Sequence, residues 1–304
     1  MGIIAVILVL ASGGLHSIWN FLVKRSEDKL CFLWGAKVIS VLLLSPLFSL
    51  YITFDVRIFR GDGGNLAYLL ALGFISGTVH LLYNYFLSQA YRFGDISLSY
   101  PIARGAAPFL VVLVAFFFLG EVPSVLGLLG MLMVALGIVS MVITRSSGNP
   151  RKYEEKNSDP SSGLFGFQSP VLFAAITAIM ISGYVFIDGR GSRVFGPLVF
   201  MYVFSLISTT LLTIPMMGKK NAVYRELKNN MGAVIGTGIL MPLSYFLALQ
   251  AMRLSPLAYV ASLRNISIVF AAFLGVVVLL EPFTLTRFLG SIVIFGGALL
   301  LGMS

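Results

Sequence analysis

The sequence predicts an all-α, polytopic membrane protein of about ten transmembrane helices, and three observations support this prediction. Hydrophobic residues make up 58% of the 304-residue chain and charged residues only 11%, whereas a soluble domain carries about 25% charged residues. The apolar residues fall into long runs of membrane-spanning length. The runs of the second half also repeat those of the first. Because so few charges cannot cover a water-soluble surface, we expect lipid to surround most of the protein.

Each predicted span is a run of about 20 mostly apolar residues, the length that crosses the hydrocarbon core as a helix. The predicted spans are 2–23, 30–52, 65–91, 96–119, 123–144, 170–187, 195–217, 231–252, 257–280 and 287–303. The first has no basic segment before it, so we expect a retained span and not a cleaved signal. Only residues 92–95 separate the third span from the fourth, which predicts a tight helical hairpin.

The longest polar stretch divides the chain in two. Residues 145–169 have the composition of a flexible linker, so we predict two units of five spans each, 1–144 and 170–304. LSQAYRFGDISLSYPIARG, from Leu87, aligns with LALQAMRLSPLAYVASLRN, from Leu247. The matched residues are Gln89 with Gln250, Ala90 with Ala251, Arg92 with Arg253, Arg104 with Arg264, Glu121 with Glu281, Gly130 with Gly290 and Gly137 with Gly297.

An odd number of spans in each half inverts the second half relative to the first. Inverted repeats place a binding site near the bilayer midplane, at the interface between the halves, and rocking of the halves gives alternating access. The repeat therefore favours a carrier of small molecules. A channel or a sensor is the alternative.

Three stretches carry a resemblance to a known family: HSIWNFLVKRSEDK, GDISLSYPIARGAAPFLVVLVAFFFLGE and SPLAYVASLRNISIVFAAFLGVVVLLEPF. Over nearly its whole length the chain resembles the drug/metabolite transporter superfamily, specifically its EamA-type ten-helix members. The resemblance implies two inverted EamA repeats around a central cavity, lined mainly by the first, third, fourth, sixth, eighth and ninth helices. It implies no particular substrate, because members carry amino acids, sugars, nucleotide conjugates and other metabolites.

Arginine occupies equivalent interior positions of the fourth and ninth spans, in which no carboxylate lies. Arg104 and Arg264 each lie about 10–12 Å from the start of their helix, at about 1.5 Å per residue. Charge at this depth is costly and usually faces a cavity or a partner, and a guanidinium binds carboxylate or phosphate through a planar fork.

We therefore expect Arg104, together with Tyr100, to bind an anionic substrate. Arg264, with Asn265 beside it, is the matching prediction in the second half. The alternative is that each arginine bonds helix-end carbonyls and only locks the repeat. Lys37 is also interior and is expected to snorkel or pack.

The first and third spans share a second polar pattern, His-x-x-aromatic-Asn. The spacing i, i+3, i+4 puts all three residues on one helical face, and lipid disfavours His and Asn, so both faces are expected to line the cavity. The residues are His16, Trp19 and Asn20, with Lys24 one turn further, and His80, Tyr83 and Asn84. The second half carries hydroxyl groups instead, among them Tyr184, so the predicted cavity is asymmetric. The alternative is hydrogen bonding between spans.

All Asp and Glu residues are predicted to lie at span ends or in loops. Glu121 and Glu281 precede the next spans, where an acid favours the helix N-terminus. Asp188 is placed at the end of the sixth span, as an interface residue. Without a carboxylate inside the membrane for a proton relay, we expect facilitated efflux or exchange. Proton coupling through His16 and His80 is the second choice.

Other function classes find little support. The chain has two His and one Cys, and no HExxH, GxSxG or cofactor motif, so we expect no enzyme activity, no metal and no cofactor. The formal charge of +9 lies in the gaps between apolar runs, which is not the pattern of a nucleic-acid interface. The expected partners are a small, possibly anionic substrate and the lipid of a plasma membrane, the inner membrane in a bacterium. The chain is expected to be a monomer or a homodimer.

Two arguments about orientation disagree. Lys and Arg concentrate in the gaps after the odd-numbered spans, which would place these gaps in the cytoplasm and both termini outside. The resemblance implies the reverse, with both termini in the cytoplasm.

Overall fold

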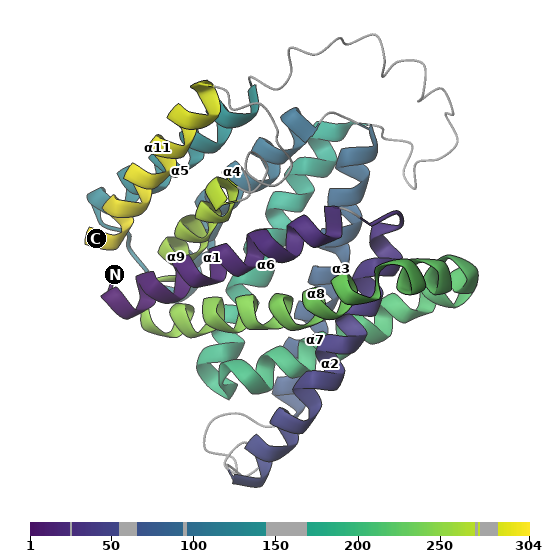
Figure 1. Cartoon of the computed structure of the whole chain (residues 1–304). Coiled ribbons are helices and arrows are strands. Elements are labelled where there is room, and N and C mark those ends of the chain that lie inside the picture. The colour runs from purple at the N-terminus through teal and green to yellow at the C-terminus, as the bar shows by residue number, and fades with distance from the viewer. Residues whose placement is uncertain (25, 55–65, 94–95, 144–168, 271–272, 274–284) are drawn as a thin grey trace.

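Every regular element in the described part of the chain is a helix (Figure 1). The computed structural model describes residues 1–24, 26–54, 66–93, 96–143, 169–270, 273 and 285–304. The α-helices are α1 (Ile3–Lys24), α2 (Lys29–Phe54), α3 (Leu66–Phe93), α4 (Ile96–Leu119), α5 (Val125–Ile143), α6 (Pro170–Phe195), α7 (Pro197–Met216), α8 (Lys220–Leu254), α9 (Leu257–Leu263) and α11 (Leu285–Met303). Two short 3₁₀ segments are η5 (Met217–Lys219) and η6 (Arg264–Ile266).

Seven of the predicted spans agree with these helices to within two residues at each end. The sixth is longer than predicted and continues to Phe195. α8 contains a kink at Asn230 (φ −127°, ψ 21°), and its part after the kink corresponds to the predicted span 231–252. The predicted ninth span begins as α9, is interrupted by η6, and is described without a gap as far as Phe270. Most of the predicted linker lies outside the described residues.

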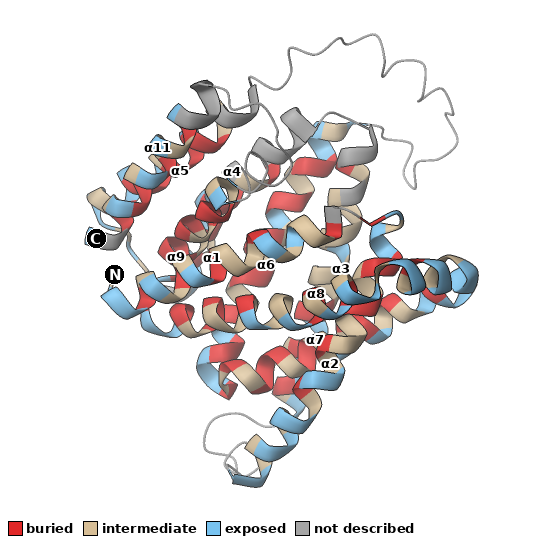
Figure 2. Ribbon diagram, viewed as in Figure 1, coloured by how far each residue is buried: buried red, intermediate tan, exposed pale blue. Residues whose placement is uncertain are grey.

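Large apolar side chains cover the outside of the helices, where exposed positions recur along the outward faces (Figure 2). Phe54 is 82% exposed, Phe117 74% and Phe118 70%, which no water-soluble monomer tolerates over a wide surface. In the described part, five helical stretches are long and apolar enough to cross a membrane: Ile3–Val23, Lys29–Phe54, Leu66–Leu87, Pro170–Phe195 and Pro197–Leu254, the last of which includes α7 and α8. The chain is therefore a multi-pass integral membrane protein.

The helices of the first half pack mainly against those of the second. α1 lies on α8, α3 on α6 and α7, α2 on α7 and α8, and α4 on α6. The two halves thus interlock and do not form separate lobes. The space enclosed between them is the place where helices from both halves can present polar side chains to one another.

Serine hydroxyls fasten α1 to the second half. The Oγ of Ser12 donates to the carbonyl oxygen of Ser244 (2.7 Å), and the Oγ of Ser244 donates to that of Ser12 (2.9 Å). One turn later, the Oγ of Ser17 donates to the carbonyl oxygen of Ser267 (2.6 Å), just beyond η6. Small residues with such bonds let membrane helices approach closely. They also position this part of α1, with His16 and Trp19, beside η6.

α5 and α11 lie side by side at one edge of the molecule (Figure 1) and meet through glycines. A Cβ atom at Gly130 would lie 2.8 Å from the carbonyl oxygen of Gly297, and one at Gly137 would lie 2.8 Å from that of Gly290. Both distances are too short for any residue with a side chain. Because the later residue of α5 meets the earlier residue of α11, the two helices run antiparallel.

The turn between α1 and α2 is tied to the start of α8. Oδ1 of Asp28 accepts from the backbone N–H groups of Leu30 (3.0 Å) and Cys31 (3.1 Å), which caps α2. The buried Glu226 accepts from the backbone N–H of Asp28 (2.9 Å). Burial opposes ionisation of Asp28, but the hydrogen bonds from Cys31 and the charge of Lys219 outweigh it and lower the pKa of Asp28.

Glu121 serves a helix of the opposite half. Its Oε2 accepts from the backbone N–H of Leu257 (2.9 Å), at the start of α9, and its Oε1 pairs with Nη2 of Arg193 (3.0 Å). The prediction that this acid favours the N-terminus of the next span, α5, is therefore wrong. An acid does support a helix N-terminus, but the helix is α9. Glu281 lies outside the described residues.

Candidate functional site in the central cavity

A cavity of about 120 Å³ lies between the two halves. Its walls come from α1, α2, α3, α4, α6, α7, α8 and η6. The lining residues are His16, Trp19, Lys37, Ser40, His80, Tyr83, Asn84, Arg104, Tyr184, Met201, Phe204, Ser205, Thr209, Met241, Pro242, Tyr245 and Arg264. This set contains three cationic side chains and no carboxylate. In the described lining, the cavity is therefore electropositive.

Most of the residues predicted for a substrate site gather in this lining. They are His16, Trp19, His80, Tyr83, Asn84, Arg104, Tyr184 and Arg264. Asn20 is exposed, and its Nδ2 donates to the carbonyl oxygen of His16 (2.7 Å). Asn265 is buried and is not part of the lining. The side chains of Lys24 and Tyr100 lie outside the described residues.

The two repeat-related arginines reach the cavity through different surroundings. Nη2 of Arg104 lies 3.4 Å from the hydroxyl oxygen of Tyr83. The guanidinium carbon of Arg264 lies 5.0 Å from the centre of the Tyr245 ring, a cation–π arrangement that needs no hydrogen bond. Each guanidinium thus lies beside a tyrosine of a neighbouring helix, Tyr83 of α3 for Arg104 and Tyr245 of α8 for Arg264.

Arg264 begins the 3₁₀ segment η6, which interrupts the helix that α9 starts. A 3₁₀ segment inside a helix often marks a hinge. The fourth helix, which carries Arg104 among Pro and Gly residues, is α-helical over its whole length, Ile96–Leu119. The helix is therefore interrupted at Arg264, which has no Pro or Gly beside it, and not at Arg104, which does. The sequence did not indicate this interruption.

Three buried polar atoms in the cavity wall have no hydrogen-bond partner among the described residues. They are Nδ1 of His16, Nε1 of Trp19 and Nε of Arg264. The rings of His16 and Trp19 pack edge to face, with their centres 4.8 Å apart. An unsatisfied buried polar atom costs about 1–3 kcal/mol. Three such atoms around one cavity indicate a place where a bound polar molecule supplies the missing partners.

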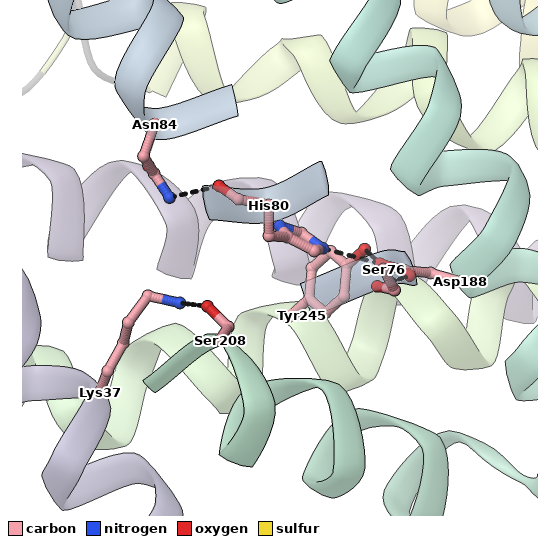
Figure 3. Close-up of polar contacts among 7 residues, drawn as sticks. All are labelled: Lys37, Ser76, His80, Asn84, Asp188, Ser208 and Tyr245. Carbon is pink, nitrogen blue, oxygen red and sulfur yellow. Dashed lines mark hydrogen bonds and ion pairs between the residues drawn. The ribbon is translucent and has the colours of Figure 1, made fainter. Parts of the chain in front are cut away.

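Lys37, which was expected to snorkel or pack, is the third cation of the lining. Its Nζ donates to the Oγ of Ser208 (2.8 Å), a hydrogen bond between α2 and α7 (Figure 3). The lysine therefore does not snorkel to the membrane surface, because its amino group joins α2 to α7 at the cavity. The position of Lys37 well inside the predicted span 30–52 could have indicated a cavity residue.

Asp188 does not lie at the end of the sixth span, where it was predicted. It lies inside α6 and is completely buried. Ser76 and Tyr245 donate hydrogen bonds to its carboxylate, and Nε2 of His80 lies 2.9 Å from its Oδ2 (Figure 3). The prediction that every Asp and Glu lies at a span end or in a loop is wrong. A carboxylate inside a predicted span also removes the reason to expect facilitated efflux or exchange without proton coupling.

The glycines after Asp188 explain the error. Gly189 and Gly191 resemble the end of a span, but α6 continues through both. A Cβ at Gly189 would lie 2.5 Å from a methyl carbon of Leu257, and one at Gly191 would lie 2.3 Å from the ring of Phe200. Both glycines therefore allow close packing and do not end the helix.

A larger, almost wholly apolar groove of about 680 Å³ lies between α2, α7 and α8. Leucine side chains dominate its lining, and Tyr51 supplies its only hydroxyl group in the described part. Met201 and Pro242 separate it from the central cavity, since they line both. A groove of this composition suits lipid chains and lacks the polar groups that orient a substrate, so the central cavity is the candidate site.

Comparison with known proteins agrees with this architecture. The model of the EamA-like transporter family, part of the drug/metabolite transporter superfamily, matches residues 168–303, in agreement with the resemblance found in the sequence. Members of this family are transporters and not enzymes. A solved structure described as "Crystal structure of protein" superposes with a TM-score of 0.72 at 20% identity, over 98% of this chain and 97% of its own, and shows a shared fold. No curated protein matches the chain.

Proposed function

We propose that this chain, which matches the EamA-like transporter family over residues 168–303, is a carrier that moves a small anionic metabolite across the plasma membrane by alternating access. The single observation behind this proposal is the electropositive central cavity. Lys37, Arg104 and Arg264 line it together, without a carboxylate among the described lining residues. Such charge at bilayer depth is costly unless it faces a partner. The partner that fits is an anion with oxygen acceptors for the guanidinium groups.

The size of the cavity supports a small substrate. Pockets that hold drug-sized ligands measure about 300–1,000 Å³, and the central cavity is about 120 Å³. An anion with few non-hydrogen atoms would fill it. The unpaired atoms of His16, Trp19 and Arg264 would then find acceptors or donors on such an anion.

The packing of the helices supports two inverted five-helix repeats, ten helices in all. The matched repeat positions relate α3 to α8, α4 to α9 and α5 to α11, and the order of the spans then relates α1 to α6 and α2 to α7. Under this exchange the contact of α1 with α8 becomes the contact of α6 with α3, and both are present. The contact between Gly130 and Gly297 likewise becomes the contact between Gly290 and Gly137, which is also present. A two-fold axis in the membrane plane would relate these contacts, as in many alternating-access carriers.

Ligand-induced stabilisation of the purified protein tests the anion site. The probes are methanesulfonate, succinate and inorganic phosphate, with the amine putrescine for comparison. A ligand that binds only the folded state raises the Tm, and the stabilisation grows with the logarithm of its concentration relative to its Kd. We expect at least one anion to raise the Tm and putrescine to have no effect.

Matched arginine variants locate the site. A hydrogen bond to a charged group is worth about 1.5–3 kcal/mol, so Arg104→Gln and Arg264→Gln should each weaken anion binding about tenfold or more. The control is Arg190→Gln, because Arg190 is exposed on α6 and donates to Tyr68 (3.0 Å), outside the cavity. If both cavity variants bind the anion as well as the unchanged protein does, the proposed site is wrong.

A further inference from the structure

The buried carboxylate of Asp188 is not used by the proposed anion site, although it lies directly behind the cavity wall. It is fully buried in α6, and partners from two other helices converge on it: Ser76 and His80 from α3 and Tyr245 from α8 (Figure 3). An ionisable residue inside the membrane is expensive to maintain and marks an ion or proton pathway by default.

His80 connects this carboxylate to the cavity. Its Nε2 lies 2.9 Å from Oδ2 of Asp188, while its side chain is 15% exposed and lines the cavity. The ring is stacked on Tyr184, with centres 4.3 Å apart, and on Phe204, at 5.0 Å. This stacking fixes the plane of the imidazole. A histidine held in this way can exchange a proton with the cavity while it stays bonded to the carboxylate.

The ionisable groups that face His80 come from the surrounding elements. Besides Asp188, they are Tyr184 on α6, Tyr245 on α8, and the cavity residues His16 on α1, Lys37 on α2, Arg104 on α4 and Arg264 on η6. The cations repel a further positive charge in this space, and a bound anion offsets them. A proton on the pair and an anion in the cavity therefore favour one another's binding, and by linkage the effect is reciprocal.

We propose that the His80–Asp188 pair is a proton site, which takes up one proton with each monovalent anion and releases it with the anion on the other side of the membrane. This inference rests on the proposed function. In the empty carrier the pair consists of a neutral imidazole and a carboxylate, with net charge −1. A proton from water adds to the imidazole and makes the pair neutral. The proton and the anion cancel, so loading leaves the net charge of the carrier unchanged and avoids moving extra charge through the bilayer.

The pH dependence of anion affinity tests the coupling. Methanesulfonate is the probe, because it does not titrate between about pH 5 and 8, the range in which histidine does. We expect its affinity to rise as the pH falls, approaching about tenfold per pH unit if one proton is bound with each anion. In Asp188→Asn and in His80→Gln we expect less than a twofold change over the whole range.

His16→Gln is the matched comparison, because His16 is the other histidine of the cavity and does not contact Asp188. This variant should bind methanesulfonate more weakly but keep the pH dependence. Asp188→Glu, which keeps the carboxylate, should keep it as well. An unchanged pH dependence in Asp188→Asn would overturn the proposal.

A second measurement needs no ligand. The chain has only two histidines, so ¹⁵N-histidine labelling gives two ring environments, and His16→Gln leaves that of His80 alone. We expect the His80 ring to change from neutral to protonated between about pH 8 and 5, and Asp188→Asn to remove this change. A His80 ring with one protonation state throughout the range would refute the proton site. If the ring titrates but no anion binds at any pH, the anion-carrier function and its coupling fail, and the proton site alone remains.

Discussion

The seam between α5 and α11 and the central cavity both form where the two halves of the chain meet, yet they differ in symmetry. In the seam, Gly130 faces Gly297 and Gly137 faces Gly290, so exchanging the halves reproduces the same contacts. In the cavity, α3 presents His80 and Asn84, whereas the matching positions of α8 are Met241 and Tyr245.

This difference shows that packing of the two halves and binding of a substrate place different requirements on the residues. Packing of two similar halves requires small residues at equivalent points on both sides of the axis. Binding one chemically defined molecule requires particular groups in particular places, which a symmetric cavity would duplicate. The two arginines are the part of the cavity that remains symmetric, and even they lie beside different aromatic residues, Tyr83 and Tyr245.

The largest expected effect comes from a side chain placed in the seam. Gly130→Leu would drive the α5 and α11 backbones apart, because even a Cβ there would lie 2.8 Å from the carbonyl oxygen of Gly297. We expect loss of the folded protein or a destabilisation of several kcal/mol, as overpacking costs about 1–3 kcal/mol even without a backbone clash. Gly297→Leu should have the same effect, measured as the Tm in detergent.

The control for the seam is Gly14→Ala, in α1, where no atom lies within 4 Å of the added Cβ. Its Tm should be unchanged or slightly raised, because alanine is the better helix former by about 1 kcal/mol. A tolerated Gly130→Leu, or effects of different size at Gly130 and Gly297, would break the symmetry of the seam.

The next effect concerns the asymmetry of the cavity. Tyr245→Asn gives α8 the residue that α3 has at the matching position. It removes a hydrogen bond to the buried carboxylate of Asp188 and the ring beside Arg264. Since a hydrogen bond to a charged group contributes about 1.5–3 kcal/mol, we expect the free energy of unfolding to fall by about 2 kcal/mol or more, with weaker anion binding. Tyr245→Phe, which keeps the ring, should lose stability but keep the contact with Arg264. Equal anion affinity in both variants would show that this contact is unimportant.

A smaller effect is expected at Lys37. Lys37→Met removes one of three cations but leaves both guanidinium groups. We expect anion affinity to fall about fivefold, equivalent to about 1 kcal/mol. Ser208→Ala removes the hydroxyl group that holds Nζ and should change the affinity less than Lys37→Met does. If Lys37→Met binds the anion with unchanged affinity, only Arg104 and Arg264 contribute to anion binding.

The smallest effect is expected outside the cavity, at the half-exposed ion pair between Glu121 and Arg193. Its side chains are 18% and 34% exposed, and pairs near solvent contribute less than about 1 kcal/mol. Glu121→Gln keeps an oxygen acceptor for the backbone N–H of Leu257, so the Tm should fall only slightly. A loss as large as that of a seam variant would mean that this contact, and not the glycine seam, holds the halves together.

The length of the hydrophobic runs was sufficient to predict most helices, because a helix that crosses lipid is apolar along its whole length. The same reasoning predicted both arginines and most of the two His-x-x-aromatic-Asn faces in the cavity lining, since polar groups at bilayer depth are expected to point inward. Asn20 is the exception, because it is exposed. The reasoning failed at Asp188, which was placed at the end of the sixth span although α6 continues to Phe195. Gly189 and Gly191 make room there for Leu257 and Phe200. Such contacts join segments distant in sequence. The 3₁₀ break at Arg264 has no local signal either.

Counterflow in proteoliposomes tests the central claim, a carrier with an anion site in this cavity, most directly. Vesicles loaded with unlabelled methanesulfonate are diluted into buffer with a trace of labelled methanesulfonate. A carrier exchanges the two, so the label should accumulate transiently inside, at a rate that saturates with concentration and falls about tenfold or more in Arg264→Gln. A flux of label that increases linearly with concentration and shows no accumulation, or that is unchanged in Arg264→Gln, would contradict the claim.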